Sequence, residues 1–316
     1  MADLHAPFSR LHSALDRLLV GQSILVQQLL VALLSGGHVI LEGVPGTGKT
    51  LLVKLLARLV QADFRRIQLT PDVLPSDILG TNIFDLNTKE FSLKRGPVFT
   101  EILLADEVNR TPPKTQSALL EAMQEQQVTL DGTSWPLPDL FWVVATQNPL
   151  EFEGTYPLPE AQLDRFLFKL EVNYPDKAAE KQMLLNNQAG FRAQRSDLER
   201  LKPVATVQHI LAARQQVQEV EVADNLLEYL LALVERTRNH GDLFLGASPR
   251  STVAWLMAAK AAAWLTQRTF VTPDDLKLVA QPLLRHRLIL RPEAQLDNIG
   301  VDRVIAGILS QVPVPR

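Results

Sequence analysis

Residues 43–50 of this chain read Gly43-Val44-Pro45-Gly46-Thr47-Gly48-Lys49-Thr50. An apolar run at residues 38–41 precedes them, and residues 51–60 resume an apolar period of 3.6, which together predict a strand, a loop and a helix. This is the context that the G-x-x-x-x-G-K-S/T pattern requires. Its glycines let backbone N–H groups turn toward a phosphate, and the helix start adds its positive dipole end. We therefore expect all eight residues to bind a phosphate chain, with Lys49 on the β- and γ-phosphates and Thr50 on Mg²⁺.

An acidic pair follows a second apolar run. Residues 102–105 end in Asp106-Glu107, 57 residues beyond Lys49. A triphosphate site needs a carboxylate for its metal, and Asp106 would hold Mg²⁺ directly or through water. Glu107 lies where the chain leaves the strand, so its side chain points elsewhere and can polarise an attacking water as a general base. Such a pair is common at strand ends, and the phosphate loop upstream is what favours the catalytic interpretation.

The remaining hydrophobic pattern predicts an α/β fold. Residues 66–69 and 141–145 also have the pattern of buried strands, and residues 115–125 have that of a helix. Residues 8–34 carry apolar side chains at helical spacing, interrupted at Gly21-Gln22. Strands that alternate with helices predict a parallel sheet with helices on both faces.

After Tyr174-Pro175 the strand signals fade and helical patterns dominate. Start signals such as Thr206 and Ser248-Pro249 support the helices, which are expected at residues 207–217, 225–238, 250–265 and 274–284. The sequence therefore predicts an α/β nucleotide-binding domain over residues 1–174 and a smaller, all-helical lid domain over residues 175–316, with a loose connection at residues 188–203.

Composition excludes several classes of protein. The chain has 316 residues, of which 46% are hydrophobic, and a formal net charge of −3. The absence of cysteine excludes disulfides, thiolate metal sites and a cysteine nucleophile. With charges of −6 before and +3 after Tyr174, the asymmetry is too small for a nucleic-acid footprint. Because no signal peptide or membrane-spanning run is visible, we expect a cytoplasmic protein without direct membrane insertion.

Over nearly its whole length the chain resembles the AAA+ ATPases, and more closely their MoxR family. The resemblance rests on the two nucleotide motifs and on five further segments that occur in the family's order. These are LTPDVLPSD at 69–77, DEVNRTPPKTQ at 106–116, ATQNP at 145–149, LPEAQLDRF at 158–166 and GASPR at 246–250. The resemblance implies an AAA+ P-loop domain with a lid, ATP and Mg²⁺ as cofactors, and hydrolysis of ATP to ADP and phosphate.

The resemblance also implies roles for residues outside the two nucleotide motifs. Asn148 corresponds to sensor 1, which orients the attacking water; on local grounds Asn-Pro is equally a turn signal. Val20-Gly21-Gln22 corresponds to the segment near the adenine, although Gly21 and Gln22 could also mark only a helix break.

Two arginines receive catalytic roles by resemblance. Arg165 corresponds to the arginine finger that reaches the ATP of the neighbouring subunit; the alternative is an ion pair with Asp164 or Glu160. Arg250 corresponds to sensor 2, an arginine of the lid that contacts the nucleotide at the seam between the domains; the alternative is a solvated side chain. Arg110 is a weaker candidate, for which a second contact between subunits and no such role are equally favoured.

Two segments have the pattern of β-hairpins. Residues 82–98 alternate apolar and polar side chains around a polar turn, and residues 127–137 carry an Asp-Gly turn signal. The resemblance equates them with the helix-2 insert and the pre-sensor-1 hairpin, which line the pore of the ring and touch the client. Ordinary decoration of the sheet edge is the alternative.

The resemblance implies a homo-oligomeric ring, expected to be a hexamer, that remodels, assembles or activates a protein client as a chaperone. A partner with a von Willebrand factor A domain is part of the same expectation. Two alternatives remain. One is a magnesium-chelatase-like motor subunit, and the other is an ATP-dependent binding switch with little hydrolysis.

Overall fold

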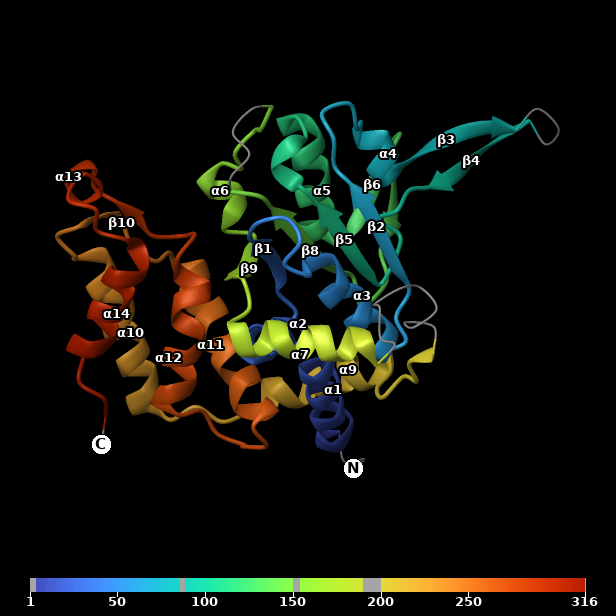
Figure 1. Cartoon of the computed structure of the whole chain (residues 1–316). Helices are drawn as coiled ribbons and strands as arrows, with labels where there is room; N and C mark the ends of the chain where they lie inside the picture. Colours follow the sequence, from blue (N-terminus) through green and yellow to red (C-terminus); the bar gives the residue numbers. More distant parts are fainter. Residues whose placement is uncertain (1–3, 86–88, 150–153, 190–199, 316) are drawn as a thin grey trace.

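The computed structural model describes residues 4–85, 89–149, 154–189 and 200–315 (Figure 1). A parallel sheet of five strands in the order β2-β5-β8-β1-β9 forms its centre. The strands are β1 (His38–Glu42), β2 (Phe64–Gln68), β5 (Ile102–Asp106), β8 (Trp142–Gln147) and β9 (Phe166–Glu171). Since all five run the same way, their carboxyl ends meet at one edge, where α/β sheets bind ligands.

Alternating side chains of the central strands face two separate cores. Val39, Leu104 and Val144 pack with α1 (His5–Leu18), α2 (Ser23–Ser35) and α3 (Lys49–Leu59). Ile40, Leu103 and Val143 pack on the other side with α4 (Pro75–Leu79) and α5 (Pro113–Glu125). The expected parallel sheet between helices is confirmed, and the break between α1 and α2 lies at Gly21-Gln22 as predicted.

Two strand predictions need correction. The segment at 66–69 is not a buried strand: β2 lies at the edge of the described sheet, pairs with β5 and leaves Arg65, Arg66 and Gln68 exposed. The fifth strand, β9, was not predicted at all. It is nearly buried and pairs with β1, so it closes the other side of the sheet.

The carboxyl-terminal part is helical, with one small addition. Its helices are α7 (Lys177–Gln188), α9 (Val207–Glu219), α10 (Asp224–Arg238), α11 (Pro249–Leu265), α12 (Pro273–Leu284), α13 (Pro292–Leu296) and α14 (Val301–Gln311). A two-stranded antiparallel ribbon, β10 (Leu243–Leu245) with β11 (Ile289–Leu290), joins them, so the lid is not purely helical. Thr206 and Ser248 cap their helices as expected.

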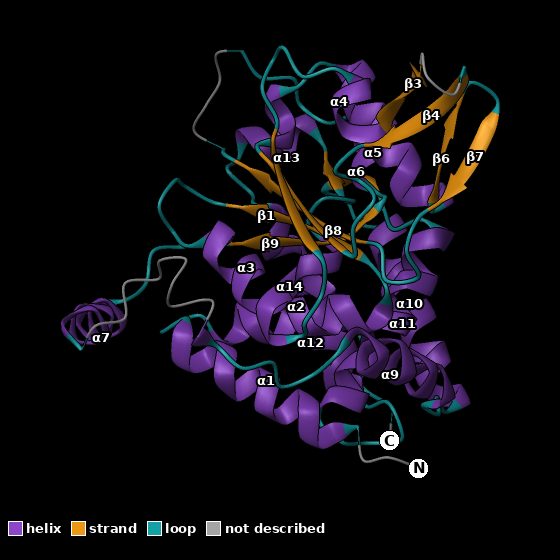
Figure 2. Cartoon of the chain, turned by 90° about the vertical axis from the view of Figure 1, so that its right-hand side faces the viewer, coloured by secondary structure: helices purple, strands orange, loops and turns teal. Residues whose placement is uncertain are grey.

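The helices after residue 174 do not form one separate body. α9 and α11 pack on α2, and one hydrophobic core runs continuously from α1 through α11 and α12. α7 instead stands out from the rest of the molecule, at the left of Figure 2. The 174/175 domain boundary stays a prediction.

Both predicted hairpins are present. β3 (Gly80–Asp85) pairs with β4 (Glu90–Arg95), and β6 (Gln127–Leu130) pairs with β7 (Thr133–Pro136). The β3–β4 hairpin projects from the body at the upper right of Figure 1. Most of its predicted turn, residues 86–88, and most of the loose connection, residues 190–199, lie outside the described residues. Across the described residues, no helix has both the length and the apolar character that crossing a membrane demands.

Candidate nucleotide site

The phosphate loop joins β1 to α3 and closes around its own lysine. Gly46 and Gly48 have φ angles of +83° and +86°, a conformation that side-chain-bearing residues rarely adopt, so glycine is required at both. Lys49 Nζ donates to the carbonyl oxygens of Gly43 at 2.6 Å and Val44 at 2.7 Å. Burial lowers the pKa of Lys49, and the nearby carboxylates of Asp106 and Glu107 oppose that shift. The ammonium group therefore lies at the first turn of α3, where phosphate oxygens are expected.

Asp106 ends β5 directly beneath the loop and is almost fully buried. Its Oδ2 lies 3.4 Å from Thr50 Oγ1, and its Oδ1 accepts a hydrogen bond from Thr146 Oγ1 at 2.5 Å. Arg66 also reaches Oδ2, with Nη2 at 2.7 Å. A hydroxyl and a carboxylate side by side are the hard oxygen donors that Mg²⁺ prefers, so Thr50 and Asp106 fit the metal that the sequence predicts.

Glu107 has a left-handed backbone, with φ at +59°. For a residue with a side chain this conformation costs about 1–2 kcal/mol, and the Glu107 carboxylate has different hydrogen-bond partners from that of Asp106. Glu107 Oε2 accepts hydrogen bonds from Gln68 Nε2 at 2.7 Å and Arg110 Nη1 at 3.3 Å, while its backbone N–H donates to Thr146 at 2.9 Å. The carboxylate is therefore held in one orientation at the rim of the site.

Asn148 follows β8 and is buried, as expected of a residue at the carboxyl end of a strand. Its carbonyl oxygen accepts a hydrogen bond from Asn109 Nδ2 at 3.4 Å. A cavity of about 400 Å³ is lined by Asn148 together with the predicted Lys49, Thr50, Asp106 and Glu107. The structure thus brings the predicted phosphate, metal and water-activating residues to one place.

A second cavity, of about 520 Å³, adjoins the phosphate loop and is mostly apolar. Its walls come from the end of α1 and the residues after it, from Gly46 to Gly48, and from Tyr174 and the middle of α7. Gln22 Nε2 donates to the carbonyl oxygen of Thr47 at 3.2 Å, which ties the α1–α2 junction to the loop. Its position and apolar lining suit the base of a nucleotide.

Gly21→Ala should weaken ATP binding through α7. Gly21 has a φ of +79°, and a Cβ there would lie 2.7 Å from Ala179 Cβ in the first turn of α7. Relieving such overpacking costs about 1–3 kcal/mol, and we expect the resulting displacement of α7 to lower ATP affinity about tenfold. Fluorescent-nucleotide titration measures it. Gly36→Ala is the matched control, because Gly36 has a φ of +77° but only ordinary contacts.

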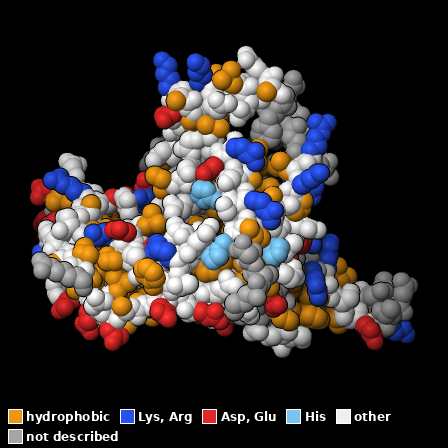
Figure 3. All heavy atoms as spheres, turned by 90° about the horizontal axis from the view of Figure 1, so that it is seen from below, with side chains coloured by type: hydrophobic (Ala, Val, Ile, Leu, Met, Phe, Trp, Pro, Cys, Tyr) orange, Lys and Arg blue, Asp and Glu red, His pale blue; other side chains and the backbone are white. Residues whose placement is uncertain are grey.

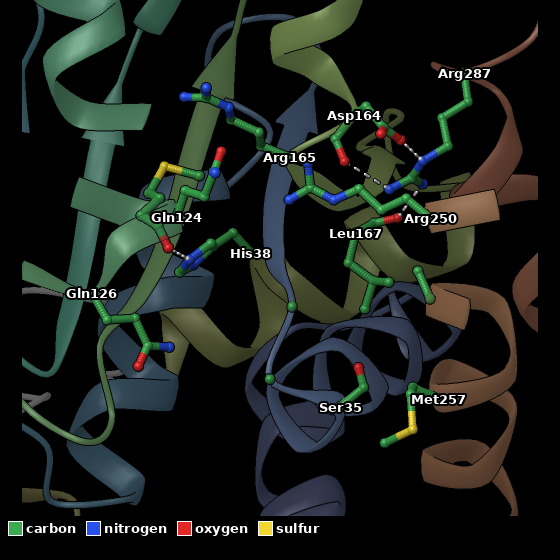
Figure 4. A pocket seen from close by; sticks show the side chains of 14 residues that line it. Ser35, His38, Gln124, Gln126, Asp164, Arg165, Leu167, Arg250, Met257 and Arg287 are labelled. Atoms are coloured by element: carbon green, nitrogen blue, oxygen red, sulfur yellow. Dashed lines mark hydrogen bonds and ion pairs between the residues drawn. The ribbon is translucent and has the colours of Figure 1, made fainter. Parts of the chain in front are cut away.

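Arg165 and Arg250 line a different cavity, and the contact of Arg250 with the nucleotide at the seam stays a prediction. Both line a cavity of about 280 Å³ together with His38, Asp164 and Arg287, as Figure 4 shows. Neither lines the cavity around Lys49, so the structure does not bring Arg250 to the phosphate loop of its own chain. Asp164 pairs with Arg287, at 2.7 Å, rather than with Arg165.

Sequence reasoning missed four polar residues of these sites. Arg66 and Gln68 come from the edge strand β2 and contact Asp106 and Glu107, while Thr146 bridges the two acids. Arg287 follows α12 and holds Asp164. Gln68 and Thr146 lie near strand ends, but a polar residue there does not by itself indicate a partner, and no signal marked Arg66 or Arg287.

The comparisons with known proteins agree with this geometry. Residues 38–168 match the model of the ATPase family associated with various cellular activities (AAA), and residues 235–308 match the AAA lid domain. Chaperone MoxR1 of Mycobacterium tuberculosis is 43% identical, over 95% of this chain and 80% of that protein. The chain belongs to the MoxR family of AAA+ ATPases.

Two further relatives match nearly the whole chain. An uncharacterized protein of Bacillus subtilis, YeaC, is 46% identical over 99% of this chain and 96% of its own length. The crystal structure of a putative ATPase from Cytophaga hutchinsonii superimposes with a TM-score of 0.90, at 39% identity, and covers 99% of this chain and 96% of that one.

Proposed function

We propose that this chain hydrolyses ATP, with Mg²⁺, in a ring of identical subunits that remodels a protein client. One observation carries the proposal: Lys49, Thr50, Asp106, Glu107 and Asn148 surround one cavity, whereas both candidate arginines line another. The first cavity holds the groups that bind ATP and activate water. Among the residues that line the first cavity, Arg66 is the arginine, and it is paired with Asp106. Neither candidate for stabilising charge on the γ-phosphate, Arg165 or Arg250, is among them.

The division of the site between two cavities favours action in trans. Arg165, directly before β9, and Arg250, on α11, line one cavity, so a neighbouring subunit docked there would receive both guanidinium groups (Figure 4). Two cations at one developing phosphate charge are a stronger stabiliser than either alone. Arg250 would then contact the nucleotide of the neighbour instead of its own. The hexamer is the ring that the family resemblance favours.

The chain's own residues perform most of the proposed reaction. The loop N–H groups and Lys49 hold the phosphates, and Asn148 orients the attacking water. Glu107, oriented by Gln68 and Arg110, accepts the proton of that water. Mg²⁺ on Thr50 and Asp106 would neutralise phosphate charge when bound. For Mg²⁺ to bind Asp106 Oδ2 directly, Arg66 must share or release that oxygen. If a water lies between Mg²⁺ and Asp106, the ion pair with Arg66 can stay.

Client remodelling is proposed from the family and from the projecting hairpin. Ile83, Phe84 and Phe91 on β3–β4 are exposed, and the two phenylalanine rings lie 5.1 Å apart. Such an apolar surface suits transient contact with a protein client, including one presented by a von Willebrand factor A domain partner. The face in Figure 3 carries Lys and Arg at scattered positions and acidic groups along one margin, without a broad basic surface among its described residues. Because the charge asymmetry along the chain is also too small for a nucleic-acid footprint, we do not propose nucleic acid as a partner.

Lys49→Ala tests the ATP site directly. Hydrogen bonds to charged groups contribute about 1.5–3 kcal/mol each, so losing the ammonium should lower ATP affinity at least about 100-fold and abolish hydrolysis. Calorimetric titration with ATP and a phosphate-release assay measure both. Lys54→Ala, on the same helix α3 but outside the lining of the cavity, should bind ATP normally. Unchanged affinity in Lys49→Ala would refute the placement of the phosphates.

The two alternatives predict different results. An ATP-dependent switch would bind ATP with the same residues but would scarcely hydrolyse it, and the Glu107, Asn148 and Arg165 set argues against that. A magnesium-chelatase-like motor would hydrolyse ATP equally well, so only the partner recovered with the intact ring separates it from a MoxR-type chaperone.

A further inference from the structure

Arg287 is the most completely hydrogen-bonded buried charge that the described residues present. Its side chain is only 4% exposed, and Nε donates to Asp164 Oδ1 at 2.7 Å. Its Nη atoms donate to backbone carbonyls of Asp164 at 3.2 Å, Phe166 at 2.6 Å and Leu167 at 2.8 Å, and to that of Leu283. Three of these carbonyls and the carboxylate belong to residues 164–167, the segment that carries Arg165.

Two neighbouring lid residues reinforce this attachment. His286 Nε2 donates a hydrogen bond of 2.9 Å to the carbonyl oxygen of Phe166, and Ser251 Oγ lies 3.5 Å from Asp164 Oδ1. Ser251 follows Arg250 at the start of α11. The segment before β9 is thus attached to the start of α11 through Ser251 and to the turn after α12, as Figure 4 shows for the pair of Asp164 and Arg287.

Arg165 itself projects from this fixed segment. The residues on both sides of it are bound to the lid by Arg287, whereas its own side chain lines the open cavity. A guanidinium group acts on a phosphate only when it is held at the correct place, and a misplacement of about 1 Å costs about 10²-fold in rate. Whatever orients residues 164–167 therefore sets the reach of Arg165.

We propose that Arg287 is a positioning residue that couples the lid to Arg165, so that the lid and the arginine finger of one subunit move together at the ATP site of the next. This inference rests on the proposed function, since it requires Arg165 to act in trans. The same frame carries Arg250, so both arginines would respond to one movement of the lid.

Arg287→Gln and Asp164→Asn break the attachment from its two sides. The Asp164 variant keeps the shape of the side chain, and its 26% exposure makes it the safer of the two for folding. Each variant should lower kcat about 100-fold while KM and the affinity for ATP stay unchanged, because the cavity around Lys49 is untouched. A purely structural role would lower thermal stability and change ATP binding as well.

Mixed rings with Lys49→Ala subunits separate action in trans from action in cis. A Lys49→Ala subunit binds no ATP but offers an intact finger, whereas an Asp164→Asn or Arg287→Gln subunit binds ATP but offers a displaced one. The mixture should therefore hydrolyse ATP at least tenfold faster than either variant alone. The gain comes from sites where the intact finger faces bound ATP. The Arg165→Ala subunit mixed with Lys49→Ala is the reference for such rescue.

Arg285→Gln is the matched control. Arg285 also ties the lid to β9, through Glu171 at 3.2 Å, and it pairs with Asp302 at 2.9 Å. Among the described residues it makes no hydrogen bond or ion pair with residues 164–167. Its loss should leave kcat within about twofold of wild type. The inference is overturned if Lys49→Ala rescues Arg165→Ala but not the Arg287 and Asp164 variants. If Arg165→Ala itself is not rescued, the proposed action in trans fails first, and the positioning role fails with it.

Discussion

Arg165→Ala lowers kcat for ATP hydrolysis by about 10³- to 10⁵-fold, the range found when an arginine finger is removed from other nucleotide hydrolases. The reason is electrostatic: the guanidinium group neutralises charge that develops on the γ-phosphoryl group, and it contributes little to the ground state. ATP affinity should therefore stay within about threefold of wild type, because Arg165 does not line the cavity around Lys49 of its own chain. Steady-state hydrolysis and nucleotide titration measure the two quantities.

The control for Arg165 is an arginine without a place in either cavity. Arg303→Ala, on the exposed side of α14, removes the same charge and should hydrolyse ATP at the wild-type rate. A loss of less than tenfold in Arg165→Ala would remove Arg165 from catalysis and leave the alternative of a structural surface residue.

Glu107→Gln should bind ATP and retain it, with kcat reduced about 10²- to 10⁴-fold, as expected for loss of a general base. The substitution keeps the size of the side chain, and Arg110 and Gln68 can still donate to its amide oxygen. It removes the basic group that accepts the proton of the attacking water. Single-turnover hydrolysis and the amount of ATP recovered with the protein measure the rate and the retention.

Glu101→Gln provides the comparison for Glu107. Glu101 precedes β5 at the strand end opposite the site, where its Oε2 accepts a hydrogen bond from the Asp63 N–H at 2.7 Å. That variant should turn over ATP normally. Wild-type hydrolysis in Glu107→Gln would transfer the role of base to another residue and contradict the arrangement proposed here.

Local rules explain why the phosphate loop and its helix were predictable. Two glycines with φ near +85°, followed by Lys49 at the first turn of α3, are dictated by neighbours within eight residues. Asp106 and Asn148 were equally accessible, since each follows an apolar strand and all parallel strands end at one edge. The helix caps at Thr206 and Ser248 obey the same short-range logic.

The strand errors have physical causes. β9 escaped prediction because Lys169 and Glu171 interrupt its apolar run, and the structure shows that Lys169 is neutralised by Glu42 of β1 at 2.7 Å. β2 was taken as buried because the sequence does not show which strand lies at the edge. The sheet order decides that, and it depends on contacts across the whole domain.

The site residues that were missed act over long distances in the sequence. Arg66 reaches Asp106 across 40 residues, and Arg287 reaches Asp164 across 123. No local pattern encodes either pair. The cavity that Arg250 lines was not predictable for the same reason: the start of its helix was correctly predicted, but the face of the molecule on which α11 lies is set by its packing on α2 and α12.

The central claim is that the catalytic site is shared between subunits. The most direct test measures steady-state ATPase activity as a function of protein concentration. In the same experiment, Arg165→Ala is mixed into wild type at increasing ratios. We predict that specific activity rises with concentration and that the variant lowers activity further than dilution alone requires. Activity that is independent of concentration, together with a variant that acts only as a diluent, would contradict the shared site and favour a self-contained nucleotide switch.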